Sequence, residues 1–206
     1  MERSGKGGRL TGERIYLRPY RTTDAQALSD MTSRDEIYRS TYNIQRDFDV
    51  EHARWWIKFN ANCRRTGTSY EFGIFEKGSD RLVGNIGIVN VNSRCCHATL
   101  AYYVHPEMWN KGIATEAGRL ILNYAFNTLV LNRVGAVCMV DNASSRRVLD
   151  KLGFTFEGVA RQEIMKDGVF YDVAHYGLLC EDYEKNEKNE KNEKVKNQDN
   201  DGSCEV

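Results

Sequence analysis

The 206-residue chain lacks an excess of either charge, because 29 basic side chains balance 29 acidic ones. Without net positive charge, bulk electrostatics gives no reason to expect a nucleic-acid or membrane-surface partner. The chain also lacks any apolar stretch near the roughly 18 residues that would span a bilayer. Its polar, glycine-rich start, residues 1–12, contains no apolar leader. We therefore expect a soluble, cytoplasmic protein.

Metal and disulfide chemistry have little support in the sequence. The six cysteines are scattered without a Cys-x-x-Cys pair, and the four histidines show no spacing typical of metal ligands. We therefore predict neither a disulfide framework nor a metal site.

Composition divides the chain into a core and two ends. After Tyr183 the sequence repeats Glu-Lys-Asn with almost no apolar residue to bury, which is typical of a disordered, charged tail over 184–206. Residues 1–12 are predicted to be a disordered N-terminus. Between them, 13–183 is long enough to form a single domain.

Alternation and turn signals predict about seven strands and about four helices in that domain. A helix beginning near 113 would connect a strand ending near Val104 to a strand beginning near Arg133, so these two strands should run parallel. The neighbouring hairpins should be antiparallel. The sequence thus predicts an α/β fold with a mixed sheet, and a ligand at the carboxyl end of the parallel pair. The predicted strands lie at 14–20, 69–77, 81–92, 96–104, 133–140, 154–166 and 169–179.

The stretch "HPEMWNKGIATEAGRL" (105–120) places a glycine immediately before a helical pattern. The first N–H groups of a helix have no intrahelical partner and carry partial positive charge, so this turn is suited to a phosphate. The alternative is an ordinary connection from strand to helix.

Together, "PEMWNKGIATEA", "DNASSRRVLDKLGF" and the order of elements resemble the GNAT acetyltransferases, and most closely their ribosomal-protein N-terminal acetyltransferase branch. The resemblance covers residues 14 to about 183. It implies the GNAT fold, with the parallel strands splayed apart, and acetyl-CoA as co-substrate without a metal.

The resemblance also implies where acetyl-CoA binds. The family motif is Arg or Gln, two residues, Gly, one residue, then Gly or Ala, and Gly112 and Ala114 fill its last two positions, whereas Trp109 replaces the basic or amide residue. The pantetheine arm would lie in the gap between the splayed strands. The implied cofactor-binding residues are Tyr103, Val104, Asn110, Lys111, Gly112, Ile113, Ala114, Thr115 and Asn142.

Two catalytic candidates come from the same resemblance. Many family members carry a tyrosine seven positions after the asparagine, but Leu149 stands there; this branch instead places a serine three positions after it, which makes Ser145 the candidate proton donor. The alternative is that Ser145 only caps its helix. Glu163 is the candidate general base, although the branch's acidic residue also aligns one position away, at Ile164, and Glu163 could be an ordinary exposed strand carboxylate.

The expected acceptor is the α-amine of a protein N-terminus. That amine has a pKa of about 7.7–8.0, against about 10.4 for an alkyl ammonium, so much more of it is neutral at pH 7. Acidic residues at 35, 36 and 51 favour a polycation instead. The alternatives are therefore a polyamine or small-molecule amine acetyltransferase, or a catalytically idle acyl-CoA-binding module.

Overall fold

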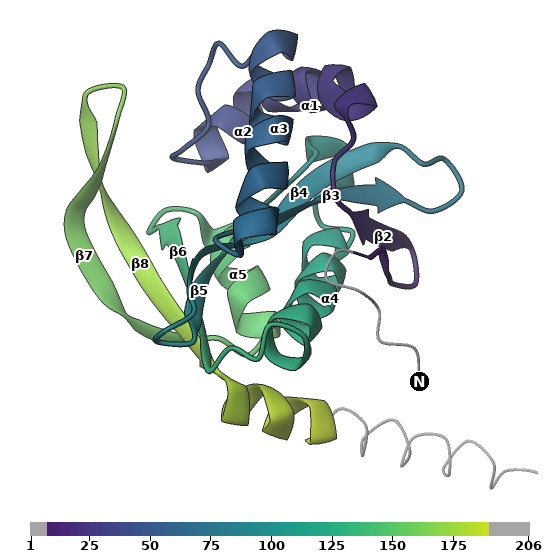
Figure 1. The fold of residues 1–206 in the computed structure, drawn as a ribbon. Helices are drawn as coiled ribbons and strands as arrows, with labels where there is room; N and C mark the ends of the chain where they lie inside the picture. The colour runs from purple at the N-terminus through teal and green to yellow at the C-terminus, as the bar shows by residue number, and fades with distance from the viewer. Residues whose placement is uncertain (1–7, 190–206) are drawn as a thin grey trace, which may run out of the picture.

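The computed structural model describes residues 8–189. Within them, eight strands form one sheet in the order β1-β2-β3-β4-β5-β6-β8-β7, and every neighbouring pair is antiparallel except β5 and β6 (Figure 1). The last two strands make a long hairpin that projects from the body of the molecule (Figure 1). The strands are β1 (Leu10–Thr11), β2 (Ile15–Arg18), β3 (Tyr70–Glu76), β4 (Leu82–Asn92), β5 (His97–Val104), β6 (Arg133–Met139), β7 (Thr155–Lys166) and β8 (Val169–Leu179).

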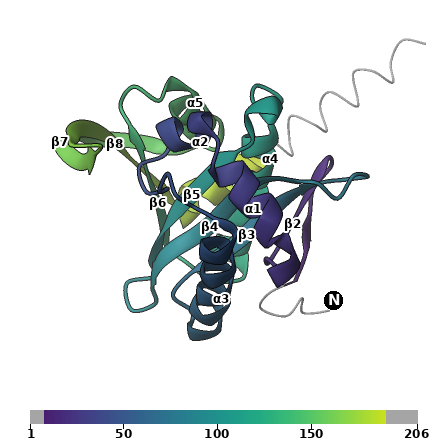
Figure 2. The ribbon, with the colours of Figure 1, turned by 90° about the horizontal axis from the view of Figure 1, so that it is seen from above.

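Helices cover both faces of the sheet (Figure 2). On one face, α1 and α3 bury Leu28 and Ala53 against Phe75. On the other, α4 buries Ile121 and Leu122 in the larger core. The helices are α1 (Ala25–Thr32), α2 (Asp35–Ser40), α3 (Val50–Thr66), α4 (Ile113–Asn127) and α5 (Ala143–Lys151), with 3-10 helices at Thr22–Asp24 and Pro106–Met108; residues 180–189 are helical as well.

Local signals fix the ends of the helices that border the site. At the start of α3, the side chain of Asp49 accepts a hydrogen bond from the backbone of His52, and the helix ends at Gly67 in the left-handed conformation with φ 77°. At the start of α5, Asn142 accepts from the backbone of Ser145. These are the residue types that helix ends favour, so the chain enters and leaves these helices at defined points.

The two parallel strands separate part-way along their length. β5 and β6 pair only from His97 with Arg133 to Leu100 with Ala136, whereas β5 continues beside β4 as far as Val104. The predicted splay is thus confirmed. The separation leaves backbone groups of both strands facing a gap, where an extended ligand can pair with them.

The α/β fold with a mixed sheet is confirmed, with more elements than predicted. The eighth strand is β1, whose two residues are too short for an alternating pattern; α2 and the helix over 180–189 account for the additional helices. Because residues 10–11 pair with β2, the sheet includes part of the segment predicted to be disordered. The boundary predicted after Tyr183 falls inside a helix, and the rest of the predicted tail, 190–206, lies outside the described residues.

Tyr183 anchors this last helix to the core, and its removal should be costly. Its ring stacks on Phe126 with the centroids 4.9 Å apart, and only 8% of the residue is exposed. We expect Tyr183→Ala to lower the free energy of unfolding by about 3 kcal/mol, because a large buried ring is lost. Deleting residues 190–206, which contain few apolar side chains, should change it by less than about 0.5 kcal/mol. Urea unfolding of both variants measures the difference, and equal stability would show that the helix does not support the core.

Candidate active site

A cavity of about 580 Å³ opens where β5 and β6 separate. Its walls come from β3 to β6, from the first turns of α4 and α5, and from the segment 40–48 that leads into α3. Eight of the predicted site residues lie in this wall and are therefore brought together: Tyr103, Val104, Asn110, Gly112, Ile113, Ala114, Thr115 and Asn142, with Ser145 beside them.

The first turn of α4 presents backbone donors to the cavity. Gly112 precedes the helix with φ 75°, and no side chain caps the helix at that position. The first intrahelical bond of this turn runs from the N–H of Glu116 to the carbonyl of Gly112, so the N–H groups of Ile113, Ala114 and Thr115 precede it. Three donors at the positive end of a helix fit a diphosphate.

The turn before α4 is braced from two sides. On the cavity side, the Trp109 indole N–H donates to the carbonyl of Val104 over 2.7 Å. On the other side, a guanidinium nitrogen of Arg14 donates to the carbonyl of Lys111 over 2.6 Å. Lys111 itself lines a separate depression of about 320 Å³ with Arg14 and Lys77, so the structure does not bring its side chain into the main cavity. A carbonyl oxygen has a second lone pair, so Val104 can still accept from a ligand.

The two serines at the start of α5 have different partners. The Ser144 hydroxyl donates to the Asn142 side chain at 2.9 Å, which reinforces the helix cap. The Ser145 hydroxyl lies 2.8 Å from the phenol oxygen of Tyr102, on β5. Burial raises the pKa of Tyr102, which keeps the phenol protonated at neutral pH. Ser145 and Tyr102 thus form a proton-bearing pair in the wall of the cavity.

Glu163 does not lie among the residues that line the cavity. It sits on β7, where the pairing register shifts between Ala160 and Ile164, and its carboxylate contacts the His175 ring of β8 at 2.5 Å. Both side chains are more than a third exposed. The structure therefore does not bring Glu163 together with Ser145.

A second carboxylate, which the sequence analysis did not identify, does line the cavity. Glu71 lies on β3, and one of its carboxylate oxygens accepts a 2.8 Å hydrogen bond from the side chain of Asn85 on β4. Asn85 is 3% exposed, and its side-chain oxygen accepts from the Tyr20 hydroxyl at 2.9 Å. Two polar residues inside otherwise apolar strands were the available sequence signal, but the signal gives no partner until the register is known.

Burial controls the charge of this cluster. Desolvation raises the pKa of Glu71 to about 7, against a weaker opposing effect of the Asn85 hydrogen bond and of Arg64. The pKa of Tyr103 is also raised, first by burial and then by the negative charge of Glu71. The carboxyl of Glu71 therefore changes its charge near neutral pH, within electrostatic reach of Tyr103 on β5, the strand that borders the gap.

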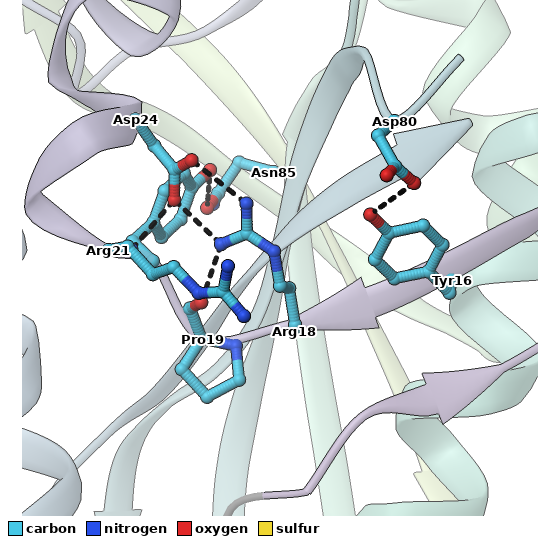
Figure 3. A network of polar contacts seen from close by, with 8 residues as sticks. Tyr16, Arg18, Pro19, Arg21, Asp24, Asp80 and Asn85 are labelled. Atoms are coloured by element: carbon cyan, nitrogen blue, oxygen red, sulfur yellow. Dashed lines mark hydrogen bonds and ion pairs between the residues drawn. The ribbon is translucent and has the colours of Figure 1, made fainter. Parts of the chain in front are cut away.

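An ion pair fixes the segment that carries Tyr20. Arg18 donates to both carboxylate oxygens of Asp24, at 2.7 and 2.9 Å, and Asp24 also accepts from the backbone of Arg21, with Asn85 close by (Figure 3). Burial opposes the charge of Asp24, but the hydrogen bonds from Arg18 and Arg21 outweigh it and lower its pKa. The ion pair thereby holds the turn at 18–24, from which Tyr20 donates to Asn85.

The tip of the β7–β8 hairpin is joined to α2, next to the segment 40–48. The Tyr38 hydroxyl donates to Asp167 at 2.5 Å, and Lys166 donates to the carbonyls of Tyr38 and Thr41. Because Ser40 and Thr41 line the cavity, these bonds tie the hairpin to the wall of the cavity.

Comparison with known proteins decides the family. Residues 14–155 match the Acetyltransferase (GNAT) domain. The chain belongs to the GNAT acetyltransferases. It is 34% identical to the Probable N-acetyltransferase YjcK of Bacillus subtilis over 180 residues, covering 85% of this chain and 99% of that one. It is 26% identical to the [Ribosomal protein uS5]-alanine N-acetyltransferase of Escherichia coli over 168 residues, covering 80% and 87%.

Solved GNAT structures share the fold. A structure described as a probable acetyltransferase is 28% identical with a TM-score of 0.77, covering 84% of this chain and 97% of that one. RimJ of Mycobacterium smegmatis, solved with CoA-disulfide, is 25% identical with a TM-score of 0.75, covering 85% and 87%.

The chain is thus an acetyl-CoA-dependent acetyltransferase, and its residues fit that co-substrate. The uncapped first turn of α4 suits the diphosphate, and the gap beyond Leu100 suits the pantetheine arm. Among residues 8–189, no group of three or more potential metal ligands occurs. In the same part of the chain, no helix is long and apolar enough to cross a membrane.

Proposed function

We propose that this GNAT enzyme transfers the acetyl group of acetyl-CoA directly to the α-amine of a protein N-terminus. The observation that carries the proposal is the composition of the cavity wall. Among its described residues Glu71 is the single carboxylate, which suits one amine better than a polycation. The relatives include an enzyme named for acetylating the alanine of ribosomal protein uS5, which supports a protein acceptor.

The acidic residues that favoured a polyamine are largely neutralised. Asp35 pairs with Arg39 and Arg46, at 2.8 and 3.3 Å, and Glu51 pairs with Arg54. Neither Asp35 nor Glu51 lines the cavity, and the same holds for Glu36. Exposed ion pairs of this kind leave little field to attract a polycation.

Amine acidity supports the same acceptor. At pH 7 on the order of a tenth of a peptide α-amine is neutral, whereas less than about one part in a thousand of an alkyl ammonium is neutral. Direct attack on a thioester needs the neutral amine, so the α-amine requires less help from the enzyme.

A comparison of acceptors tests the proposal. The enzyme and acetyl-CoA are incubated at pH 7 with one acceptor at a time, either a peptide with a free N-terminal Ser or Ala or spermidine. The release of CoA is followed with a thiol reagent. We expect the peptides to react at least about tenfold faster, because far more of their amine is neutral. As a matched control, the same peptides with an acetylated α-amine and a free lysine should not react.

Other outcomes would replace the proposal with a specific alternative. Efficient turnover of spermidine, together with no turnover of the peptides, would establish a polyamine acetyltransferase. Acetyl-CoA binding by isothermal titration, without CoA release for any amine in the panel, would establish a catalytically idle acyl-CoA-binding protein.

A further inference from the structure

Glu71 occupies a pocket that the backbone makes for it. On β4, Gly87 is the register partner of Glu71, and a Cβ added to Gly87 would lie 2.3 Å from a carboxylate oxygen of Glu71. The missing side chain therefore leaves the space in which the carboxylate turns along the sheet toward Asn85. The hydrogen bond from Asn85 then fixes the carboxylate in that direction.

This pocket lies on the sheet face that meets α1 and α3. Asn85 is the register partner of Tyr103 on β5, and Tyr103 packs against the core beneath those helices. Tyr103 follows Leu100, the last β5 residue paired with β6, so it borders the gap. Glu71 is separated from the gap by β4 and β5, but its carboxylate turns toward Asn85 and its negative charge contributes to the raised pKa of Tyr103, which borders the gap. Glu71 and Ser145 therefore share one cavity, although they come from opposite faces of the sheet.

We infer that Glu71 is the general base of the acetyl transfer, held in place by Gly87 and by the Asn85–Tyr20 hydrogen bonds. The inference requires only the acetyltransferase activity; that its substrate is an α-amine rests on the proposed function. Glu71 accepts the proton from the attacking amine, directly or through one water. The step is not assigned to Glu163, which lies outside the cavity lining and pairs with His175.

The step balances in protons and electrons. The amine nitrogen forms a bond to the acetyl carbon, and one of its N–H bonds breaks as the proton passes to the carboxylate of Glu71. The C–S bond breaks, and its electron pair leaves with the sulfur of CoA. The sulfur takes a proton from the Ser145 hydroxyl, which recovers one from water by way of Tyr102, and Glu71 later returns its proton to water.

The acidity of Glu71 suits an α-amine. With a pKa of about 7, the Glu71 carboxylate is present at the pH where an α-amine of pKa about 7.7–8.0 is partly neutral, so the neutral amine and the charged base can meet in one complex. An alkyl amine of pKa near about 10.4 is neutral in less than about one part in a thousand at that pH. The pKa of Glu71 therefore supports α-amines as the class of acceptor, whichever peptide carries the amine.

The test compares a variant that removes the charge of Glu71 with a variant that displaces its carboxylate. The acceptor is the amine on which the wild-type enzyme is fastest, so failure of the peptide proposal leaves this test intact. We expect Glu71→Gln to lower kcat about a hundredfold while the KM for acetyl-CoA is unchanged. Gly87→Ala keeps the carboxylate but displaces it, and we expect at least a tenfold loss in kcat.

Two matched controls separate catalysis from folding. Glu76→Gln makes the same substitution on the same strand, outside the main cavity, and should leave kcat unchanged. Gly135→Ala places a Cβ in an interior strand with only ordinary contacts, the nearest at 3.8 Å, and should also leave kcat unchanged. Thermal melts of all four variants show whether each is folded.

A readout independent of rate follows the carboxyl itself. Carbon-13 NMR of the glutamate-labelled protein, with the Glu71 signal assigned by its loss in Glu71→Gln, should titrate near pH 7. A kcat within threefold of wild type in folded Glu71→Gln, or a hundredfold loss in Glu163→Gln instead, would overturn the inference. A Glu71 titration near pH 4 would contradict the environment on which it rests.

Discussion

Replacing Gly112 by valine is expected to weaken acetyl-CoA binding by about a hundredfold or more. Gly112 has φ 75°, which a β-branched residue does not adopt without strain, so the turn should rearrange. The N–H groups of Ile113 and Ala114 would then lose their alignment. Each charge-assisted hydrogen bond contributes about 1.5–3 kcal/mol, and two of them correspond to at least a hundredfold in affinity. Isothermal titration with acetyl-CoA measures the change.

The control is the same substitution at a glycine with similar strain and no ligand. Gly78, in the turn between β3 and β4, has φ 90° and no atom within 4 Å of an added Cβ. Gly78→Val should therefore lower stability by about 1–3 kcal/mol, as Gly112→Val does, and leave affinity for acetyl-CoA unchanged. An equal affinity in both variants would mean that the diphosphate does not bind at the start of α4.

The elements that the sequence predicted are those with long local patterns. All seven predicted strands are present, because each is a run rich in β-branched or aromatic residues and is bounded by turn residues. β1 has two residues and α2 has six, which is too few for either period to show. The helix over 180–189 was missed because Glu-Lys-Asn repeats resemble a solvated tail, whereas the burial of Tyr183 against Phe126 is a tertiary contact.

The residues of the candidate site also fall into two groups: those that a local sequence pattern reveals and those that only the fold brings together. The turn at 110–115 was predicted as a unit because the donors that suit a phosphate are adjacent in the sequence. Glu71, Asn85 and Tyr20 come from three segments, and only the register of β3 with β4 reveals that Gly87 makes room for the carboxylate. Glu163 was the candidate base because the resemblance placed its strand beside the acceptor pocket. The direction of its side chain could not be read from strand alternation, because β7 is irregular between Ala160 and Ile164 and Gln162 has φ 53°.

Removing both hydroxyls of the Ser145–Tyr102 pair is expected to lower kcat about a hundredfold. The departing sulfur of CoA needs a proton, and general acids contribute about a hundredfold to ten-thousandfold to such steps. If Ser145 donates this proton and recovers it from Tyr102 over their 2.8 Å contact, the two hydroxyls act as one unit. Ser145→Ala, Tyr102→Phe and the double variant should then have similar values of kcat, and the effects should not add.

Ser144→Ala is the matched control for this pair. Its hydroxyl bonds Asn142 and not Tyr102, so the variant should lose about 1 kcal/mol of stability and retain its kcat. The pH dependence gives a second measurement. Because burial raises the pKa of Tyr102, the phenol stays protonated, and the ratio of wild-type to double-variant kcat should be constant from about pH 6 to pH 9. A wild-type kcat in the folded Ser145→Ala variant, or additive losses in the double variant, would show that Ser145 only caps α5 and that the sulfur takes its proton from another source.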